Sequence, residues 1–458
     1  MPAIPVLVQV LIVFALVVAA SAKKMHLGLA AVLGGFLFAA LRGIPIGVAL
    51  GAALAEILDP DTILLLLLIT AIMALSTAMK TSGALAAFSR SVARVAPSPR
   101  ASMALTPLLI GTLPMPGGAI LSAPLVDALD PDRLQGADGL SAVNYWFRHC
   151  LELSWPLFPA FILTSTLSGI AAPRLILLNL YTPFLFILLG ELFVMKRGAF
   201  AAKATMGAKV EGASVADYAD GQGSDTESAQ PVSRPFSSKL YDLGGFIPLG
   251  TVLCVYAALD ALCRVLVPGL GLSEAGAKLV GRYLPIFSGI GAGCLYVART
   301  SLKKGAFRGS VNAGSLKLAL VIGGIRVFAA LLESGGVAQA SADELAAWGI
   351  PAIAAAVILP FVSGLVTGVG FGYVGIAFPI VFGLFPTGGS MPLEAVVVLA
   401  GAFGFAGMML SPLHVCMVVT AEHFGTGLTA VIKRFALPLS LYLAMASAYV
   451  AALAKFLK

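Results

Sequence analysis

Long apolar segments separated by short polar ones follow one another along almost the whole 458-residue chain. A transmembrane helix needs about 20 apolar residues to cross a hydrocarbon core of about 30 Å. Segments of that kind lie at 4–21, 27–58, 62–80, 101–126, 143–170, 175–195, 243–266, 277–297, 314–334, 349–386, 393–421 and 435–456. Hydrophobic residues make up 59% of the chain and charged residues 11%, against about 25% charged in an ordinary soluble domain. The pattern predicts an all-α polytopic membrane protein surrounded by the lipid bilayer.

The basic residues predict how these segments are oriented. Lys and Arg collect around 23–24, 80–100, 196–239, 299–308 and 433–434, whereas the loops at 59–61, 267–276, 335–348 and 387–392 contain none. Loops rich in Lys and Arg stay in the cytoplasm. The basic loops all reach one side only if segments 101–126 and 349–386 each enter and leave the membrane on the same side. We therefore expect about ten transmembrane helices and two re-entrant hairpins, with the basic loops in the cytoplasm and both termini outside.

The chain divides into two halves of matching design. Each half contains three apolar spans, a hairpin and two more spans, and the odd number of spans gives the second half the opposite orientation. Such inverted-topology repeats are frequent in secondary transporters. We expect residues 1–195 and 242–458 to be the two repeats. Residues 196–241 are rich in Gly, Ser, Asp and Pro and cannot bury enough apolar surface to order, so they are predicted to form a flexible cytoplasmic linker.

Gly, Pro and small polar residues interrupt both hairpin segments, which read PLLIGTLPMPGGAILSAP (107–124) and PFVSGLVTGVGFGYVGIAFP (360–379). Irregular backbone at membrane depth is tolerated only where protein buries it or where it lines a wet cavity. Paired interruptions in two halves therefore point to a transporter binding site. The alternative is close helix packing, because Gly364 and Gly368 have the GxxxG spacing. The candidate substrate contacts in the two tips are Thr112, Pro114, Pro116, Gly117 and Gly118, and Ser363, Thr367, Gly368 and Gly370.

A second pair of interruptions follows the hairpins, at Ser154-Trp155-Pro156 and Ser411-Pro412. Proline removes a backbone donor and breaks a helix, which frees carbonyl groups for a ligand. Carbonyl and hydroxyl oxygens are suitable ligands for sodium. The candidate sodium ligands are Thr112, Ser154, Thr367 and Ser411.

The stretch NYWFRHCLELSWP (144–156) is the most polar of the apolar segments. A charge at the bilayer centre costs about 2.5–3.5 kcal/mol, so Arg148, His149 and Glu152 should face protein or water. Arg148 and Glu152 are four residues apart, a spacing that allows a structural ion pair on a helix. The alternative makes Arg148 the counter-charge of an anionic substrate, with Glu152 or His149 as the proton-coupling group. Asn144 and His414 complete the candidate substrate contacts, although a lone His in such a segment is more often a packing residue.

Several classes of function lack their sequence signals. The chain has no GxxxxGK motif followed by Ser or Thr, which argues against a nucleotide-driven pump, and no HExxH or GxSxG motif, which argues against an enzyme. The net charge of +7 resides in the loops, so we expect no nucleic-acid partner. The five cysteines lie in apolar segments without CxxC spacing and are expected to be buried free thiols, neither disulfides nor metal ligands.

Three strings carry a resemblance to known proteins: LPMPGGA (113–119), NYWFRH (144–149) and MLSPLHVC (409–416). Through them the chain resembles an uncharacterised prokaryotic family of integral membrane proteins in the ion transporter superfamily. It is distantly similar to gluconate permeases, to the large membrane subunits of TRAP transporters and to divalent-anion carriers, although it lacks the Ser-Asn-Thr hairpin signature of the sodium-coupled divalent-anion carriers. The resemblance implies a homodimeric elevator-type carrier in which hairpins and broken helices move against a scaffold.

The expected function is a cation-coupled secondary transporter of a small organic anion. The coupling ion would be sodium or a proton, with no other cofactor. An ion or solute channel built on the re-entrant loops is the alternative, because such loops also form selectivity filters.

Overall fold

A computed structural model describes residues 4–23, 25–84, 91, 98–112, 119–130, 132–195, 246–300, 305, 307–309, 313–337, 340, 343–344, 347–349, 351–385 and 391–457. These residues form helices and connecting loops and include no β-strand. The predicted linker, 196–241, lies outside the described residues.

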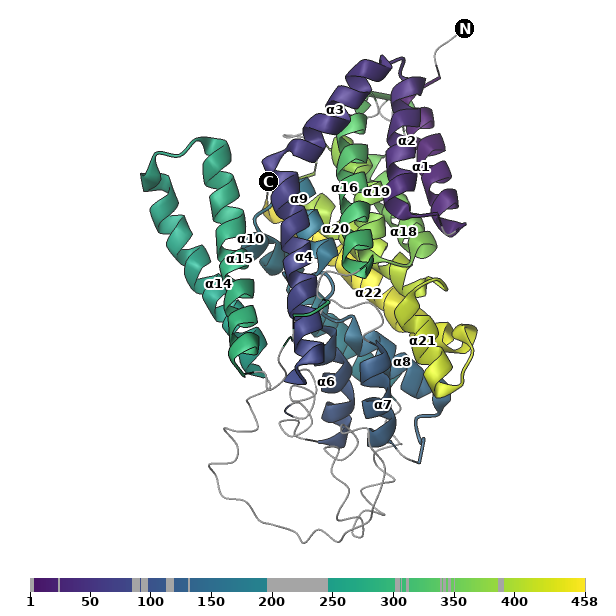
Figure 1. Ribbon diagram of the computed structural model, residues 1–458. Coiled ribbons are helices and arrows are strands. Elements are labelled where there is room, and N and C mark those ends of the chain that lie inside the picture. Colours follow the sequence, from purple (N-terminus) through teal and green to yellow (C-terminus); the bar gives the residue numbers. More distant parts are fainter. Residues whose placement is uncertain are drawn as a thin grey trace.

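The helices of the first half are α1 (Val6–Ala22), α2 (Leu27–Leu41), α3 (Ile46–Leu58), α4 (Pro60–Thr81), α6 (Pro99–Gly111), α7 (Ala119–Leu129), α8 (Ala137–Arg148), α9 (Pro159–Ser168), α10 (Ala172–Asn179), α11 (Tyr181–Leu189) and the short π-helix η1 (Gly190–Val194). Those of the second half are α14 (Ile247–Leu266), the 3₁₀-helix η3 (Val267–Leu270), α15 (Glu274–Thr300), α16 (Ala313–Ser334), α18 (Ala352–Thr367), α19 (Gly370–Gly383), α20 (Leu393–Leu410), α21 (Val415–Phe424) and α22 (Leu428–Phe456). Figure 1 shows α14 and α15 as a helix pair beside the main body, next to α4.

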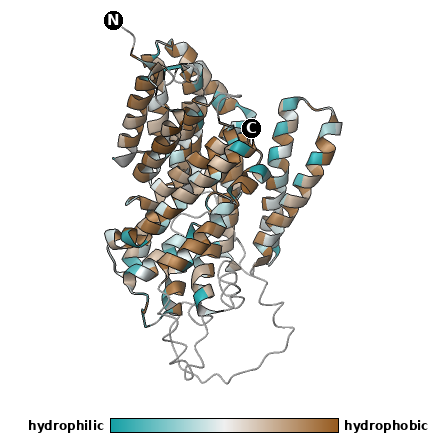
Figure 2. Cartoon of the chain, turned by 180° about the vertical axis from the view of Figure 1, so that it is seen from behind, coloured by the Kyte–Doolittle hydropathy of each residue, from teal (hydrophilic) through white to brown (hydrophobic). Residues whose placement is uncertain are grey.

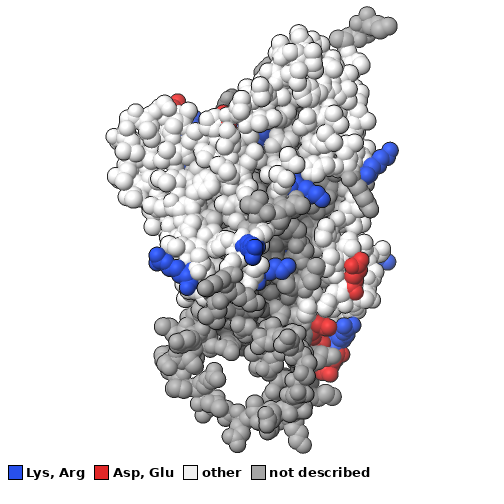
Figure 3. Space-filling model, in the orientation of Figure 1, with Lys and Arg blue, Asp and Glu red and all other residues white. Residues whose placement is uncertain are grey.

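The outer surface is that of a multi-pass membrane protein. Five helical segments of the described chain are long and apolar enough to span a bilayer: Pro60–Thr81, Ala172–Val194, Ile247–Leu270, Leu393–Phe424 and Leu428–Phe456. Large apolar side chains point outward, among them Val265 with 76% of its surface exposed and Phe184 with 68%. Figure 2 shows this hydrophobic exterior on most helices, and Figure 3 shows a face made mostly of uncharged side chains. The count of about ten spans remains a prediction.

Helical hairpins occupy both interrupted segments. Helix α6 packs against α7, and α18 packs against α19. The four helices contain 13, 11, 16 and 14 residues, fewer than the about 20 that a full span requires. In the second hairpin only Gly368 and Val369 separate the helices, and Gly368 adopts the left-handed conformation with φ of 64°. The tip of the first hairpin, 113–118, lies outside the described residues.

The two predicted helix breaks are present. Helix α8 ends at Arg148 and α9 begins at Pro159, whereas α20 ends at Leu410 and α21 begins at Val415. Prolines within or directly after each break prevent the helix from continuing. Gly364 of α18 leaves no room for a Cβ against the backbone of α20, so the packing role predicted for this glycine is confirmed.

Helix packing follows the matching positions of the two proposed halves. Helix α2 packs on α16, and α15, which corresponds to α2 in the second half, packs on α4, which corresponds to α16. The second helix of each hairpin packs on the second part of the other half's broken helix, α19 on α9 and α7 on α21. These pairings are those expected for two related halves, and the inverted repeat itself remains a prediction.

Candidate functional site

A cavity of about 400 Å³ lies where the second hairpin and both helix breaks meet α4, α16 and the start of α2. Its volume is in the range of small-molecule sites, which span about 300–1,000 Å³. The residues that line it are His26, Met73, Gly111, Arg148, His149, Glu152, Phe158, Pro159, Ala160, Lys317, Leu318, Val321, Gly368, Val369, Gly370, Phe371, Met408, His414, Val415 and Cys416. The structure thus brings six of the predicted site residues to one cavity: Arg148, His149, Glu152, Gly368, Gly370 and His414.

Glycines let the hairpins approach the helix breaks closely. Gly111, at the end of α6, packs directly on the carbonyl of Arg148, with no space for a Cβ. A Cβ on Gly368 would lie 2.8 Å from the backbone nitrogen of His414, and one on Gly370 would lie 2.9 Å from the Cβ of Ala160 and 3.0 Å from Oε1 of Glu152. The contacts with the His414 backbone and the Ala160 Cβ are closer than side chains normally allow, so both positions favour glycine.

Helix ends of both polarities lie at the cavity. Helices α9, α19 and α21 begin there, with Pro159, Gly370 and Val415 among its lining residues. Helices α6 and α8 end there, at Gly111 and Arg148, and α18 ends one residue before the lining residue Gly368. Because helix N-termini carry partial positive charge and C-termini partial negative charge, the cavity wall offers backbone contacts suited to an anion and backbone contacts suited to a cation.

Cationic side chains outnumber acidic ones in the cavity lining. Arg148 and Lys317 face a single carboxylate, Glu152. The side chain of Arg148 is almost fully buried, and its Nη1 has no hydrogen-bond partner among the described residues. Nε2 of His26 is likewise buried without a partner there. A buried donor without a partner costs about 1–3 kcal/mol, which a bound anion would offset.

The predicted ion pair between Arg148 and Glu152 does not form, and this prediction was wrong. No such pair occurs in the described part of the chain, although both residues belong to it. The reason is that α8 ends at Arg148, and His149 already caps it. The four-residue spacing brings side chains together only on a continuous helix.

Four further predicted substrate contacts belong to the described chain and are not among the cavity-lining residues: Thr112, Asn144, Ser363 and Thr367. The Asn144 amide donates to the carbonyl of Ala119 at 3.3 Å and to the hydroxyl of Thr420 at 3.1 Å, and so ties α8 to α7 and α21. Ser363 donates to the carbonyl of Gly372 at 3.4 Å, within the second hairpin. Pro114, Pro116, Gly117 and Gly118 lie outside the described residues.

The candidate sodium ligands also lie outside the cavity lining. Three of the hydroxyls donate to nearby carbonyls, Thr112 to Leu109 at 2.7 Å, Ser154 to Leu151 at 3.5 Å and Thr367 to Ser363 at 2.7 Å. The fourth, Ser411, accepts from the backbone nitrogen of Leu413 at 3.2 Å. Their local role is to stabilise the ends of the broken helices and hairpins, and their role as sodium ligands remains a prediction.

One group at the cavity was missed by the sequence analysis. His149, His414 and Cys416 place their potential ligand atoms within 4.8 Å of one another. The spacing of cysteines along the chain gave no signal for this cluster, because it contains one cysteine and because His149 comes from the first half and His414 and Cys416 from the second.

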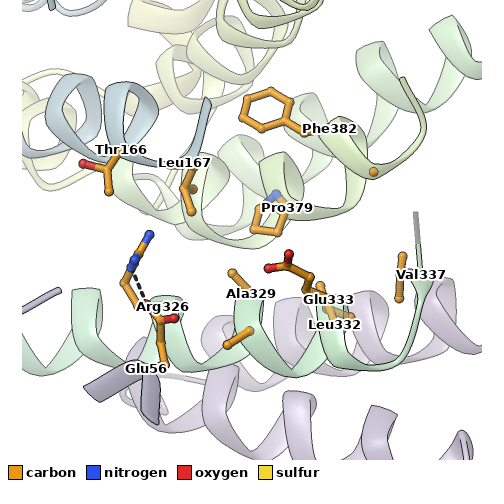
Figure 4. A pocket seen from close by; sticks show the side chains of 12 residues that line it. Glu56, Thr166, Leu167, Arg326, Ala329, Leu332, Glu333, Val337, Pro379 and Phe382 are labelled. Atoms are coloured by element: carbon orange, nitrogen blue, oxygen red, sulfur yellow. Dashed lines mark ion pairs between the residues drawn. The ribbon is translucent and has the colours of Figure 1, made fainter. Parts of the chain in front are cut away.

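A second cavity of about 330 Å³ lies between α16 and the helices α9 and α19. Figure 4 shows Arg326 and Glu333 on α16 facing Thr166 of α9 and Pro379 of α19. Arg326 pairs with Glu56 of α3 at 2.7 Å. Asp61 joins this network, at 3.5 Å from Arg326 and 2.9 Å from Arg282 of α15, and thereby links α4, α15 and α16.

One close contact lies between the stretches of α16 that line the two cavities. Helix α16 lines the first cavity with residues 317–321 and the second with residues 326–333. Between these stretches, the Ile325 side chain fills the space beside Gly375 of α19 so completely that a Cβ there would overlap it. Helices α16 and α19 therefore line both cavities, and the contact of Ile325 with Gly375 lies between the two sets of lining residues.

Comparisons with known proteins identify the family of the chain and a solved structure of similar fold. No curated protein matches it. The solved structure of the YdaH transporter of Alcanivorax borkumensis, described as having an unusual topology, is similar with a TM-score of 0.52 and 14% sequence identity, over 85% of this chain and 84% of that one. At this identity the likeness shows a shared fold. Similarity to gluconate permeases and TRAP subunits is not shown by these comparisons. A family model matches residues 5–204 and 285–453, and the chain therefore belongs to the family described as "Protein of unknown function (DUF401)".

Proposed function

We propose that this protein is a secondary active transporter that carries a small organic anion together with a cation. The observation that carries the proposal is the buried guanidinium of Arg148, which lines the first cavity and whose Nη1 has no hydrogen-bond partner in the described chain. A carboxylate or similar group is the natural partner of such a donor, because hydrogen bonds between charged groups are about twice as strong as neutral ones.

The surroundings of Arg148 support an anion. Lys317 and three histidines share the lining with it, and the N-termini of α9, α19 and α21 converge there. Half-helix N-termini that point at an anionic group are a recurring design of transporter sites near the midplane. The size of the cavity suits a small organic molecule.

A co-transported cation would bind beside Glu152. Glu152 is the only carboxylate among the described residues that line the cavity, and the C-terminal ends of α6, α8 and α18 lie at the same cavity. Carbonyl groups at helix C-termini attract cations. We therefore assign the coupling cation, sodium or a proton, to the vicinity of Glu152.

The tight contact between the cavities favours a carrier over a channel. A channel conducts through a continuous pore, whereas the tight contact of Ile325 with Gly375 lies between the stretches of α16 that line the first and second cavities. Helices α9 and α19 line both cavities, so sliding them along α16 would move a bound solute from one side to the other. This arrangement supports an elevator mechanism with α16 as part of the scaffold.

We also propose a homodimer in the prokaryotic cytoplasmic membrane, built from two inverted repeats. Only 11% of the apolar span that contains α14 is buried within the chain, so this helix has an open face for a dimer contact. Its outward face would contact either lipid or a second copy.

Reconstitution into lipid vesicles tests the proposed function. Vesicles loaded with an unlabelled organic anion should accumulate the labelled anion by exchange, and imposed sodium or proton gradients should drive uptake. The panel would contain mono-, di- and hydroxycarboxylates. Arg148→Gln should lose exchange, whereas Arg264→Gln, which removes an exposed arginine of α14 outside the cavity, should retain it. Flux that neither saturates nor exchanges would favour a channel, and no flux of any anion would refute the anion assignment.

A further inference from the structure

We infer that His149, His414 and Cys416 bind one transition-metal ion of the Zn²⁺ class at the wall of the first cavity. The two imidazoles and the thiol come from the two helix breaks: His149 follows α8, His414 caps the N-terminus of α21, and Cys416 is the second residue of α21. Their potential ligand atoms all lie within 4.8 Å of one another, and all three residues line the cavity.

The geometry suits coordination by these side chains. The ring centroids of His149 and His414 are 4.9 Å apart and the rings are nearly perpendicular, at 78°. Metal–ligand distances of about 2.0–2.3 Å place the ligand atoms of a tetrahedral zinc ion about 3.5 Å apart. The observed separations, up to 4.8 Å, exceed that distance, so the three ligand atoms would move closer together when a metal binds.

Hydrogen bonding leaves both imidazoles available as ligands. Nδ1 of His149 lies 2.7 Å from the carbonyl of Tyr145, so this nitrogen donates its proton and Nε2 carries the lone pair. Metal-bound histidines commonly have a carbonyl in this second position, which fixes the tautomer. Nδ1 of His414 is buried and has no hydrogen-bond partner among the described residues. Burying a polar nitrogen without a partner costs free energy, and a metal bound to this nitrogen would remove that cost.

The donor set selects the type of metal. Imidazole nitrogen and thiolate sulfur suit Zn²⁺, Co²⁺ or copper, whereas sodium, magnesium and calcium prefer oxygen. Three protein ligands leave a fourth position for an exogenous ligand, as in catalytic rather than structural zinc sites. Because the cluster faces the cavity, a carboxylate of the transported anion could occupy that position, an extension that rests on the proposed function.

Cobalt titration of the purified full-length protein in detergent tests the site without any transport assay. After chelator treatment, Co²⁺ should bind at one ion per chain and produce a thiolate-to-cobalt charge-transfer band together with the visible bands of a tetrahedral site. Zn²⁺ should displace it. Cys416→Ser should abolish the charge-transfer band and weaken binding at least tenfold, whereas Cys294→Ser, in α15 outside the cavity, should leave the spectrum unchanged.

The outcomes separate this inference from the proposed function. A wild-type protein that shows no stoichiometric cobalt binding, or a Cys416→Ser spectrum identical to that of wild type, would overturn the metal site. Because the wild-type titration needs no variant to fold, a misfolded Cys416→Ser protein does not obscure the result. Anion exchange that persists in metal-free vesicles would support the transporter proposal without a role for the metal in transport. Cobalt binding without any anion exchange would support the metal site and not the transporter proposal.

Discussion

Replacing Arg148 with Gln should weaken anion binding without a large loss of fold stability. Removing one partner of a buried ion pair typically costs about 3–5 kcal/mol, because the other charge is left uncompensated. Arg148 has no such pair in the described chain, and its Nη1 is buried without a partner. We therefore expect the free energy of unfolding of the ligand-free Arg148→Gln protein to fall by far less than that amount, or to rise.

The effect on anion binding should be large. A hydrogen bond to a charged group contributes about 1.5–3 kcal/mol. Since 1.4 kcal/mol corresponds to a factor of ten, the dissociation constant of the anion should rise about 10- to 150-fold. An anion at 100 times its wild-type dissociation constant stabilises the wild-type protein by about 2.7 kcal/mol. After a 100-fold loss of affinity the same concentration would stabilise the variant by only about 0.4 kcal/mol.

Thermal unfolding in detergent measures both quantities. The anion identified by vesicle exchange would be titrated against wild type, Arg148→Gln and the control Arg264→Gln, and isothermal calorimetry would give the dissociation constants. The control should keep the full anion-induced shift, because Arg264 is exposed on α14, lies outside the cavity lining and pairs with Asp260. The reasoning fails if Arg148→Gln unfolds several kcal/mol more easily while its dissociation constant for the anion is unchanged, because Arg148 would then be a structural residue.

Two further predictions concern close contacts of the second hairpin. Gly370→Leu should abolish anion exchange because its Cβ would meet Glu152 at 3.0 Å, whereas Gly51→Leu on α3, where a Cβ meets nothing within 4 Å, should not; equal losses in both, with poor folding, would contradict a specific role of the tip. Gly375→Val should lower stability by about 1–3 kcal/mol through overpacking and slow exchange by wedging α19 from α16. Adding Ile325→Ala to Gly375→Val should restore much of the stability, measured by thermal unfolding, and much of the exchange rate, measured in vesicles. If the double variant shows no recovery, the contact between Ile325 and Gly375 does not limit the movement of α19 along α16.

The sequence alone predicted the membrane class, the two hairpins and the two helix breaks. These features depend on local signals that act the same way in any fold: apolar length matches the bilayer, and Pro and Gly interrupt helices wherever they occur. The breaks near Pro156 and Pro412 and the short tip at Gly368 were therefore found where the sequence placed them. Six predicted site residues, Arg148 and Glu152 among them, also reached one cavity, because interruptions at matching positions lie at similar depth.

Only the tertiary structure decided how those residues face one another. The spacing of Arg148 and Glu152 predicted an ion pair, but α8 ends at Arg148, where Gly111 packs on its carbonyl, and the two side chains leave the common helix face. Similarly, the cysteine spacing predicted no metal ligands, although Cys416 lies within 4.8 Å of His149 from the other half of the chain. Contacts between residues far apart in sequence come from helix packing, and spacing along one helix carries no information about them.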